Sequence, residues 1–177
     1  MIRDIQNVDD DIACKKRKIE QILYSDPDVI EILDNKELDP TCPEDYVNTN
    51  IFGFLRIPGT QDVSKNFITF TVDDMELSPN NRVMKHQFVQ FVVFVHKDLI
   101  YTNYGMYRHD LLAYLIRDIF NLSNALGPQM ELVSNKEYVT DADYHTRTLR
   151  FELIDDNSTK PFRTNSYEYD RIVGHRR

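Results

Sequence analysis

The stretch that decides the fold is FVQFVVFV, residues 88–95. Alternate side chains of an extended chain lie on the same face, and here both faces are apolar apart from Gln90. A strand that is apolar on both sides is typical of the middle of a sheet with both faces covered. We therefore predict a central strand covered on both sides. Its two faces carry Val89, Phe91, Val93 and Val95 on one side, and Phe88, Val92 and Phe94 on the other.

Shorter apolar or alternating stretches on either side predict the rest of a sheet. The alternation of apolar side chains with threonine or charged residues indicates half-buried strands. Polar segments between them are expected to be loops, and long polar loops on a rigid sheet often carry contacts. The predicted strands are 51–57, 67–72, 129–133 and 147–154. Residues 58–66 are predicted to be a loop, and residues 134–146 a long loop or a hairpin tip.

Helices are predicted before and after the central strand. Residues 108–122 place leucine, isoleucine and phenylalanine at three- and four-residue offsets, which predicts one major helix packed on a face of the sheet. Residues 9–35 predict N-terminal helices, the second with Asp26 as its N-cap and Pro27 at its first position. The first has a narrow apolar stripe, so we expect it to lie on the surface.

Together these elements predict an α+β domain over residues 1–154, with a mainly antiparallel four- to five-stranded sheet. Residues 41–44 match a capping box, so one further helical turn or a plain loop fits there. Residues 155–177 lack a core stripe and predict an extended C-terminal arm. A polar tail cannot bury its own tyrosines, so a neighbouring chain is its expected support.

The composition limits the function. The chain has 177 residues and a formal net charge of -8, which argues against bulk nucleic-acid binding. Cys14 and Cys42 supply neither a disulfide framework nor a zinc site, so we expect a reduced, intracellular protein. The acidic N-terminal residues do not resemble a signal peptide, and the apolar runs are too short to predict a membrane segment.

Catalytic motifs are not evident. The sequence contains no glycine-rich phosphate loop and no nucleophile elbow. We therefore expect no catalytic residues, no cofactor and no metal ion. One alternative is a divalent-metal enzyme that uses Asp141, Asp143 and His145, with His109 and Asp110 nearby in space, because carboxylates and imidazoles are metal ligands. A solvated hairpin tip is the more ordinary interpretation.

Two further groups of residues suggest contacts. The basic run Lys15–Lys18 spreads around a helix, which favours a solvated surface over contact with nucleic acid or with an acidic neighbour. Tyrosines at 101, 104 and 107 either cap the core at the helix entrance or form an interface, where tyrosine and arginine are enriched. The candidate interface residues are Tyr101, Tyr104, Tyr107, Tyr167, Tyr169 and Arg171.

Four segments of the chain form a recognisable group, namely Ile22–Leu33, Asp39–Pro43, Tyr107–Ala113 and Phe120–Asn124. Together they resemble small structural proteins of the head–tail module of tailed bacteriophages. The resemblance covers about residues 18–154, and the order of elements is similar to that of tail terminator proteins.

This resemblance implies a structural virion protein of the phage neck, assembled in the host cytoplasm. Its partners would be copies of itself in a six-membered ring, the tail tube protein and the head-completion or connector protein. The ring would cap the tail tube, and DNA would pass through it without specific binding, which an acidic wall favours. The alternatives are another neck or tail-completion adaptor, the metal-dependent enzyme, and an adaptor that binds a host or regulatory protein through its tyrosines.

Overall fold

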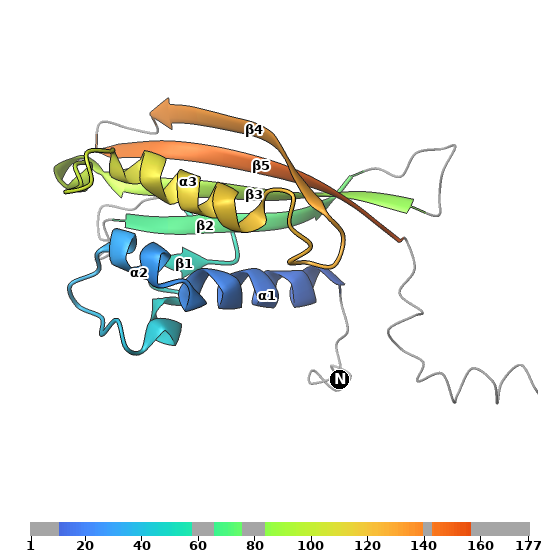
Figure 1. Ribbon diagram of the computed structural model, residues 1–177, viewed down its shortest axis with the longest axis horizontal. Coiled ribbons are helices and arrows are strands. Elements are labelled where there is room, and N and C mark those ends of the chain that lie inside the picture. The colour runs from blue at the N-terminus through green and yellow to red at the C-terminus, as the bar shows by residue number, and fades with distance from the viewer. Residues whose placement is uncertain (1–10, 58–65, 76–83, 140–142, 157–177) are drawn as a thin grey trace, which may run out of the picture.

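The computed structural model describes residues 11–57, 66–75, 84–139 and 143–156. Within these ranges the chain forms three α-helices, two 3₁₀ turns and five strands (Figure 1). In chain order they are α1 (Asp11–Ser25), α2 (Pro27–Leu33), η2 (Pro43–Tyr46), β1 (Ile51–Phe52), β2 (Asn66–Asp74), β3 (Met84–His96), η3 (Lys97–Leu99), α3 (Arg108–Phe120), β4 (Met130–Val139) and β5 (Tyr144–Asp156).

The five strands form one sheet in the order β1-β2-β3-β5-β4. Every pairing is antiparallel except that of β1 with β2. Phe91 lies in the middle of β3, opposite Phe70 on β2 and Leu149 on β5. The α+β fold, the antiparallel sheet and the central strand are therefore confirmed.

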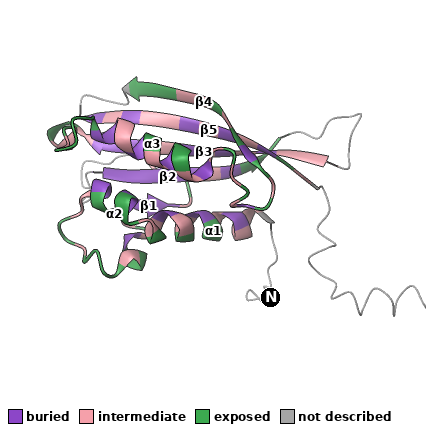
Figure 2. Ribbon diagram, in the orientation of Figure 1, coloured by how far each residue is buried: buried purple, intermediate pink, exposed green. Residues whose placement is uncertain are grey.

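All three helices lie on one face of this sheet, which we call the helical face (Figures 1 and 2). α3 lies over β3 and β5, and α1 lies against β1 and β2. The core between them is built on Phe91, whose ring lies 5.0 Å from that of Phe120 and 5.7 Å from that of Phe151. α1 adds Ile19 and Leu23, both fully buried, so it contributes more to the core than its narrow stripe predicts.

Both ends of α2 are defined by residues next to the helix in the sequence. The Asp26 carboxylate accepts hydrogen bonds from the backbone N–H groups of Asp28 (2.9 Å) and Val29 (3.1 Å), which confirms the predicted N-cap. α2 ends at Asp34, which adopts the left-handed conformation with φ 50°. A helical turn does follow at η2, but its N-cap Cys42 makes no side-chain cap, so the capping box is not formed.

Two predicted boundaries are wrong. β1 covers only the first two residues of the predicted strand 51–57. The segment 134–146, predicted to be a long loop or a hairpin tip, is mostly strand, because β4 continues to Val139 after a bulge between Leu132 and Ser134 and β5 begins at Tyr144. β4 is an edge strand and its polar side chains face water, so it lacks the alternation that marks a half-buried strand. Most of the predicted loop 58–66 lies outside the described residues.

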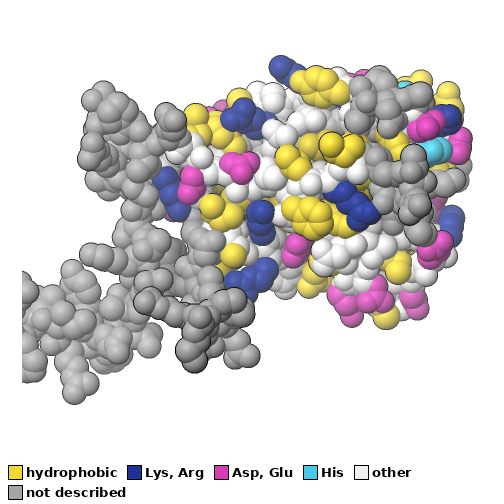
Figure 3. Space-filling model, turned by 180° about the vertical axis from the view of Figure 1, so that it is seen from behind, with side chains coloured by type: hydrophobic (Ala, Val, Ile, Leu, Met, Phe, Trp, Pro, Cys, Tyr) yellow, Lys and Arg dark blue, Asp and Glu magenta, His cyan; other side chains and the backbone are white. Residues whose placement is uncertain are grey.

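The prediction that both faces of β3 are covered is confirmed by the described residues for one face only. Opposite the helices, on what we call the open face, no described helix covers the sheet (Figure 1). A small aromatic cluster occupies one end of this face, and Phe88, Gln90 and Val92 are only half-buried. Figure 3 shows hydrophobic side chains lying among Lys and Arg side chains there. The cluster consists of Phe52, Phe67, Phe94 and Tyr144.

The predicted C-terminal arm lies almost wholly outside the described residues. β5 runs to Asp156, two residues beyond the predicted domain end at 154. Tyr167, Tyr169 and Arg171 all fall in the part of the chain that is not described, so their predicted contacts stay predictions. Within the described residues, no helix is long and apolar enough to span a membrane.

Candidate subunit interface

The segment 100–107 connects η3 to α3 and carries three of the predicted interface tyrosines. Arg108, at the first position of α3, anchors it. Its buried guanidinium donates hydrogen bonds to the carbonyls of Leu99 (2.7 Å) and Ile32 (2.5 Å), and it pairs with Asp34 at 3.2 Å. One side chain therefore fixes α2, η3 and the start of α3 relative to one another.

The tyrosines themselves face solvent. Tyr101, Tyr104 and Tyr107 are 76%, 60% and 50% exposed, so they do not cap the core as the first of our two interpretations held. The rings of Tyr101 and Tyr107 lie 5.7 Å apart, and the two residues form an isolated β-bridge. Exposed aromatic side chains on an anchored loop are the chemistry of a protein contact surface.

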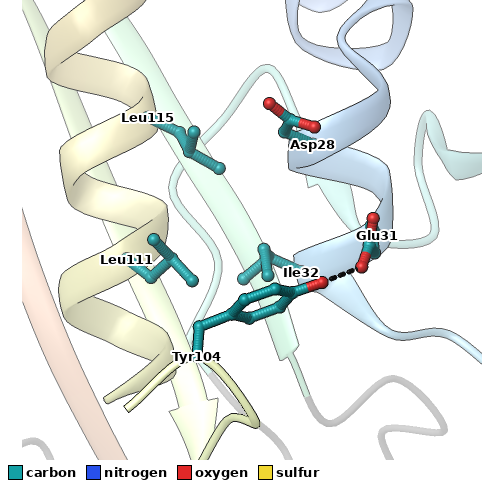
Figure 4. A pocket seen from close by; sticks show the side chains of 6 residues that line it. All are labelled: Asp28, Glu31, Ile32, Tyr104, Leu111 and Leu115. Atoms are coloured by element: carbon teal, nitrogen blue, oxygen red, sulfur yellow. Dashed lines mark hydrogen bonds between the residues drawn. The ribbon is translucent and has the colours of Figure 1, made fainter. Parts of the chain in front are cut away.

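Tyr104 closes one side of a cleft between α2 and α3, with a volume of about 240 Å³ (Figure 4). Its hydroxyl donates a hydrogen bond to the Glu31 carboxylate, and this bond, together with the charge of Glu31, raises the pKa of Tyr104 above its ordinary value. The cleft is therefore apolar at its floor and negative at its rim. The floor is Ile32, Leu111 and Leu115, and the rim is Asp28, Glu31 and Tyr104.

A polar cluster lies beside this loop, where α3 begins. His109 is only 2% exposed, and its ring stacks between those of Tyr107 (5.9 Å) and His145 (6.0 Å). Its Nε2 lies 3.3 Å from a Glu137 carboxylate oxygen, although neither ring nitrogen makes a hydrogen bond with the part of the chain that is described.

Arg147 completes this cluster from β5. It pairs with Asp110 and donates a hydrogen bond from its Nε to the Asn135 side chain at 2.7 Å. The cluster joins α3 to β4 and β5, so Asp110 is a structural partner as well as a residue in the first helical turn.

The described members of the predicted metal site do not form a ligand set, although His109, Asp110 and His145 lie close together. Asp143 instead pairs with Lys97 at 2.5 Å, and this contact lowers the pKa of Asp143. His145 stacks on His109, and Asp141 lies outside the described residues. Among the residues that the structure describes, no group of three or more His, Cys, Asp or Glu side chains is placed to hold a metal ion.

Lys15 is a residue whose role the sequence analysis missed. The basic run was expected to be solvated, but Lys15 is only 4% exposed. Its ammonium group donates hydrogen bonds to the side chains of Gln87 and Asp155, the latter at 2.6 Å. The signal was its spacing: Lys15 lies three residues after Ile12 and four before Ile19, on the apolar stripe itself.

The structure defines an α+β protein with an exposed tyrosine-bearing loop and a cleft with an acidic rim at one end of its sheet. Comparison with known protein families matches residues 19–153 to the YomW family, and the chain belongs to that family. The family is phage-derived, which suggests a phage protein. No curated protein matches the chain.

Proposed function

We propose that this protein is a structural subunit of the phage neck that forms a ring and acts as a tail terminator. In this role it caps the tail tube and joins it to the head-completion or portal complex. The observation that carries the proposal is the segment 100–107, which we call the tyrosine loop: it is anchored, its tyrosines are exposed, and it lies beside a cleft with an acidic rim. The chain that carries it belongs to a phage-derived family.

The physical argument starts from ring closure. A ring of identical subunits needs a heterologous contact, in which two different surfaces of the chain meet. The tyrosine loop and its cleft offer one surface, since tyrosine provides a large contact area at a small loss of conformational freedom. The open face of the sheet offers apolar area elsewhere on the molecule (Figure 3).

The net charge of the chain supports a position of the ring around DNA. The net charge of -8 gives a negative field, and a negative lumen lets the polyanion slide without binding. The proposed partners are therefore the tail tube protein and the connector, with DNA as a passing cargo. The proposed location is the virion neck, after assembly in the host cytoplasm.

The first test is the solution mass of the full chain by light scattering over a concentration series, with negative-stain images of the largest species. Closed rings of about six subunits support the proposal. A chain that stays monomeric alone and also in the presence of purified tail tubes contradicts it.

A second test removes the gene from the phage. A tail terminator limits the tube, so its loss should give tubes of uncontrolled length, and gold-labelled antibody should mark the head–tail junction of intact particles. Tubes of normal length that fail to join heads would favour another neck adaptor. Particles without the protein would overturn a structural role.

A further inference from the structure

We propose that the α2–α3 cleft of one subunit receives the C-terminal arm of a second copy of this chain, with residues 167–172 seated in it. The inference rests on the proposed function in that it needs subunits that associate with one another. It goes further by naming the two surfaces that meet.

The cleft sets the chemistry of its occupant. Its floor of Ile32, Leu111 and Leu115 favours an aromatic or aliphatic side chain. The carboxylates of Asp28 and Glu31 stand at its rim and favour a cation, above all a guanidinium, which pairs with carboxylates in a fixed geometry (Figure 4). A segment that carries aromatic residues and an arginine on one side meets both requirements.

The arm has this composition. Residues 157–177 contain five Lys or Arg and two Asp or Glu, a formal charge of +3, whereas residues 1–156 carry -11. Tyr167, Tyr169 and Arg171 recur at alternate positions, followed by Ile172. Both acidic residues of the arm, Glu168 and Asp170, stand between them, and an extended segment places these on its opposite side. The arm as a whole is therefore complementary in charge to the acidic rim, and within residues 167–172 the complementary group is Arg171.

The positions of the two surfaces favour contact between subunits. The cleft lies near the end of the sheet where His96 pairs with Tyr144, since Arg108 bonds to Leu99 just beyond β3. β5 ends at Asp156, at the opposite end of the sheet (Figure 1). An arm that leaves one end and a cleft that opens at the other make a head-to-tail contact, which is the kind that closes rings.

The length of the arm is sufficient. The seated residues 167–172 lie 11 to 16 residues after Asp156 and reach about 36–58 Å when extended, at roughly 3.3–3.6 Å per residue. A strand of 13 residues such as β5 is about 43 Å long. The arm can therefore reach the cleft of an adjacent subunit.

The cleft is also preformed. Arg108 ties α2 to α3 through the Ile32 carbonyl and Asp34, so the two walls do not have to assemble when the arm arrives. Binding to a preorganised site loses less free energy to ordering.

The test uses the full chain with the photo-crosslinker benzoylphenylalanine in place of Tyr169. Equal amounts of ¹⁵N-labelled and unlabelled protein are mixed, irradiated and digested. We expect heavy–light peptide pairs that join position 169 to peptides containing Glu31, Tyr104 or Leu111. Crosslinks only within one chain, or to other surfaces, would overturn the inference.

Charge variants sharpen the test. Glu31→Lys should reduce the heavy–light crosslink about tenfold, because it replaces the attraction between Glu31 and Arg171 by repulsion between two cations. The matched control is Glu37→Lys, which makes the same charge change at an exposed position outside the cleft. Glu31→Arg combined with Arg171→Glu should restore the crosslink, and a double variant that stays as weak as Glu31→Lys would contradict the pairing.

The two proposals fail in different ways. Rings that form without the crosslink to the cleft leave the neck function standing and overturn the arm contact. Heavy–light crosslinks in open chains or dimers that never close support the arm contact and count against the ring.

Discussion

On the face of β3 that carries Phe91, three helices cover the sheet; on the face that carries Phe94, none of the described helices does. Phe91 is surrounded by the rings of Phe70, Phe120 and Phe151, while Phe94 belongs to a cluster of four buried side chains at one end of the open face. The same strand thus contributes Phe91 to the large core under the helices and Phe94 to the small cluster on the open face.

The two faces therefore have different roles: the helical face stabilises the fold, and the open face is accessible for contacts. Burial of apolar area stabilises the fold, and most of that area lies under the helices. The open face keeps half-buried apolar side chains such as Phe88 and Val92 within reach of a partner. Substitutions on the two faces should therefore differ in their effect on stability. Three unfolding experiments test this, and a pH titration tests the cleft on the helical side.

The largest effect is expected for Phe91→Ala. Removal of a fully buried ring from the helical-face core should lower the free energy of unfolding by about 4 kcal/mol. Urea unfolding followed by circular dichroism measures it. A loss below about 1 kcal/mol would falsify the view that the core is centred on this residue.

Phe94→Ala makes the same chemical change on the open face. Phe94 is 6% exposed and stacks on Phe67 at 4.8 Å. Its cluster is small and can collapse around the gap, so we expect a loss of about 2 kcal/mol, roughly half that of Phe91→Ala. The same urea experiment compares the two variants directly, and equal losses would break the distinction between the faces.

Arg150→Gln tests a weaker contact on the open face. The guanidinium of Arg150 lies 3.6 Å from the centre of the Phe88 ring, a cation–π contact between half-buried side chains. Glutamine keeps part of the stem and removes the charge, so we expect a loss of about 0.5–1 kcal/mol. Thermal unfolding at low and high salt measures it, and no change at either salt concentration would mean that the contact adds nothing.

The smallest effect concerns Tyr104 at the cleft of the helical side. The hydrogen bond to Glu31 favours the neutral phenol, so Tyr104 should ionise above 10.0, and Glu31→Gln should bring its pKa back toward 10.0. The stability that this bond contributes is complete below pH 10 and is lost as pH rises through the raised pKa.

Spectrophotometric pH titration of the wild type against Tyr104→Phe isolates the phenolate signal of this one residue. A Tyr104 signal that titrates at its ordinary pKa in the wild type would show that the hydrogen bond is not formed.

Sequence patterns predicted correctly the elements whose structure depends on residues close together in the chain. The alternation around Phe91, the three- and four-residue spacing of α3 and the cap at Asp26 are local signals, and each element formed as predicted. They fail for β4, whose residues Ser134–Glu137 form a strand because β5 lies beside them. An edge strand with polar side chains has no apolar alternation that could be recognised.

The open face and the buried Lys15 could not be predicted for a different reason. An apolar face predicts burial but not the element that buries it, so the pattern at Phe88 and Val92 is the same whether a helix or another chain covers them. Lys15 reaches Asp155, a partner 140 positions away. The candidate tyrosines were identified, but the cleft beneath Tyr104 requires α2 and α3 to be placed in space.

The strand order also has a consequence for the time course of folding. Within the described sheet β4 pairs only with β5, yet β5 lies later in the chain and inserts between β3 and β4. A polypeptide is synthesised from its N-terminus, so β4 leaves the ribosome before its neighbour exists. The ladder from Met84–Asp156 to His96–Tyr144 closes loops of many residues, which slows folding. A nascent chain that stops short of residue 144 holds β3 and β4 with unpaired edges, and completion of the sheet waits for the last strand.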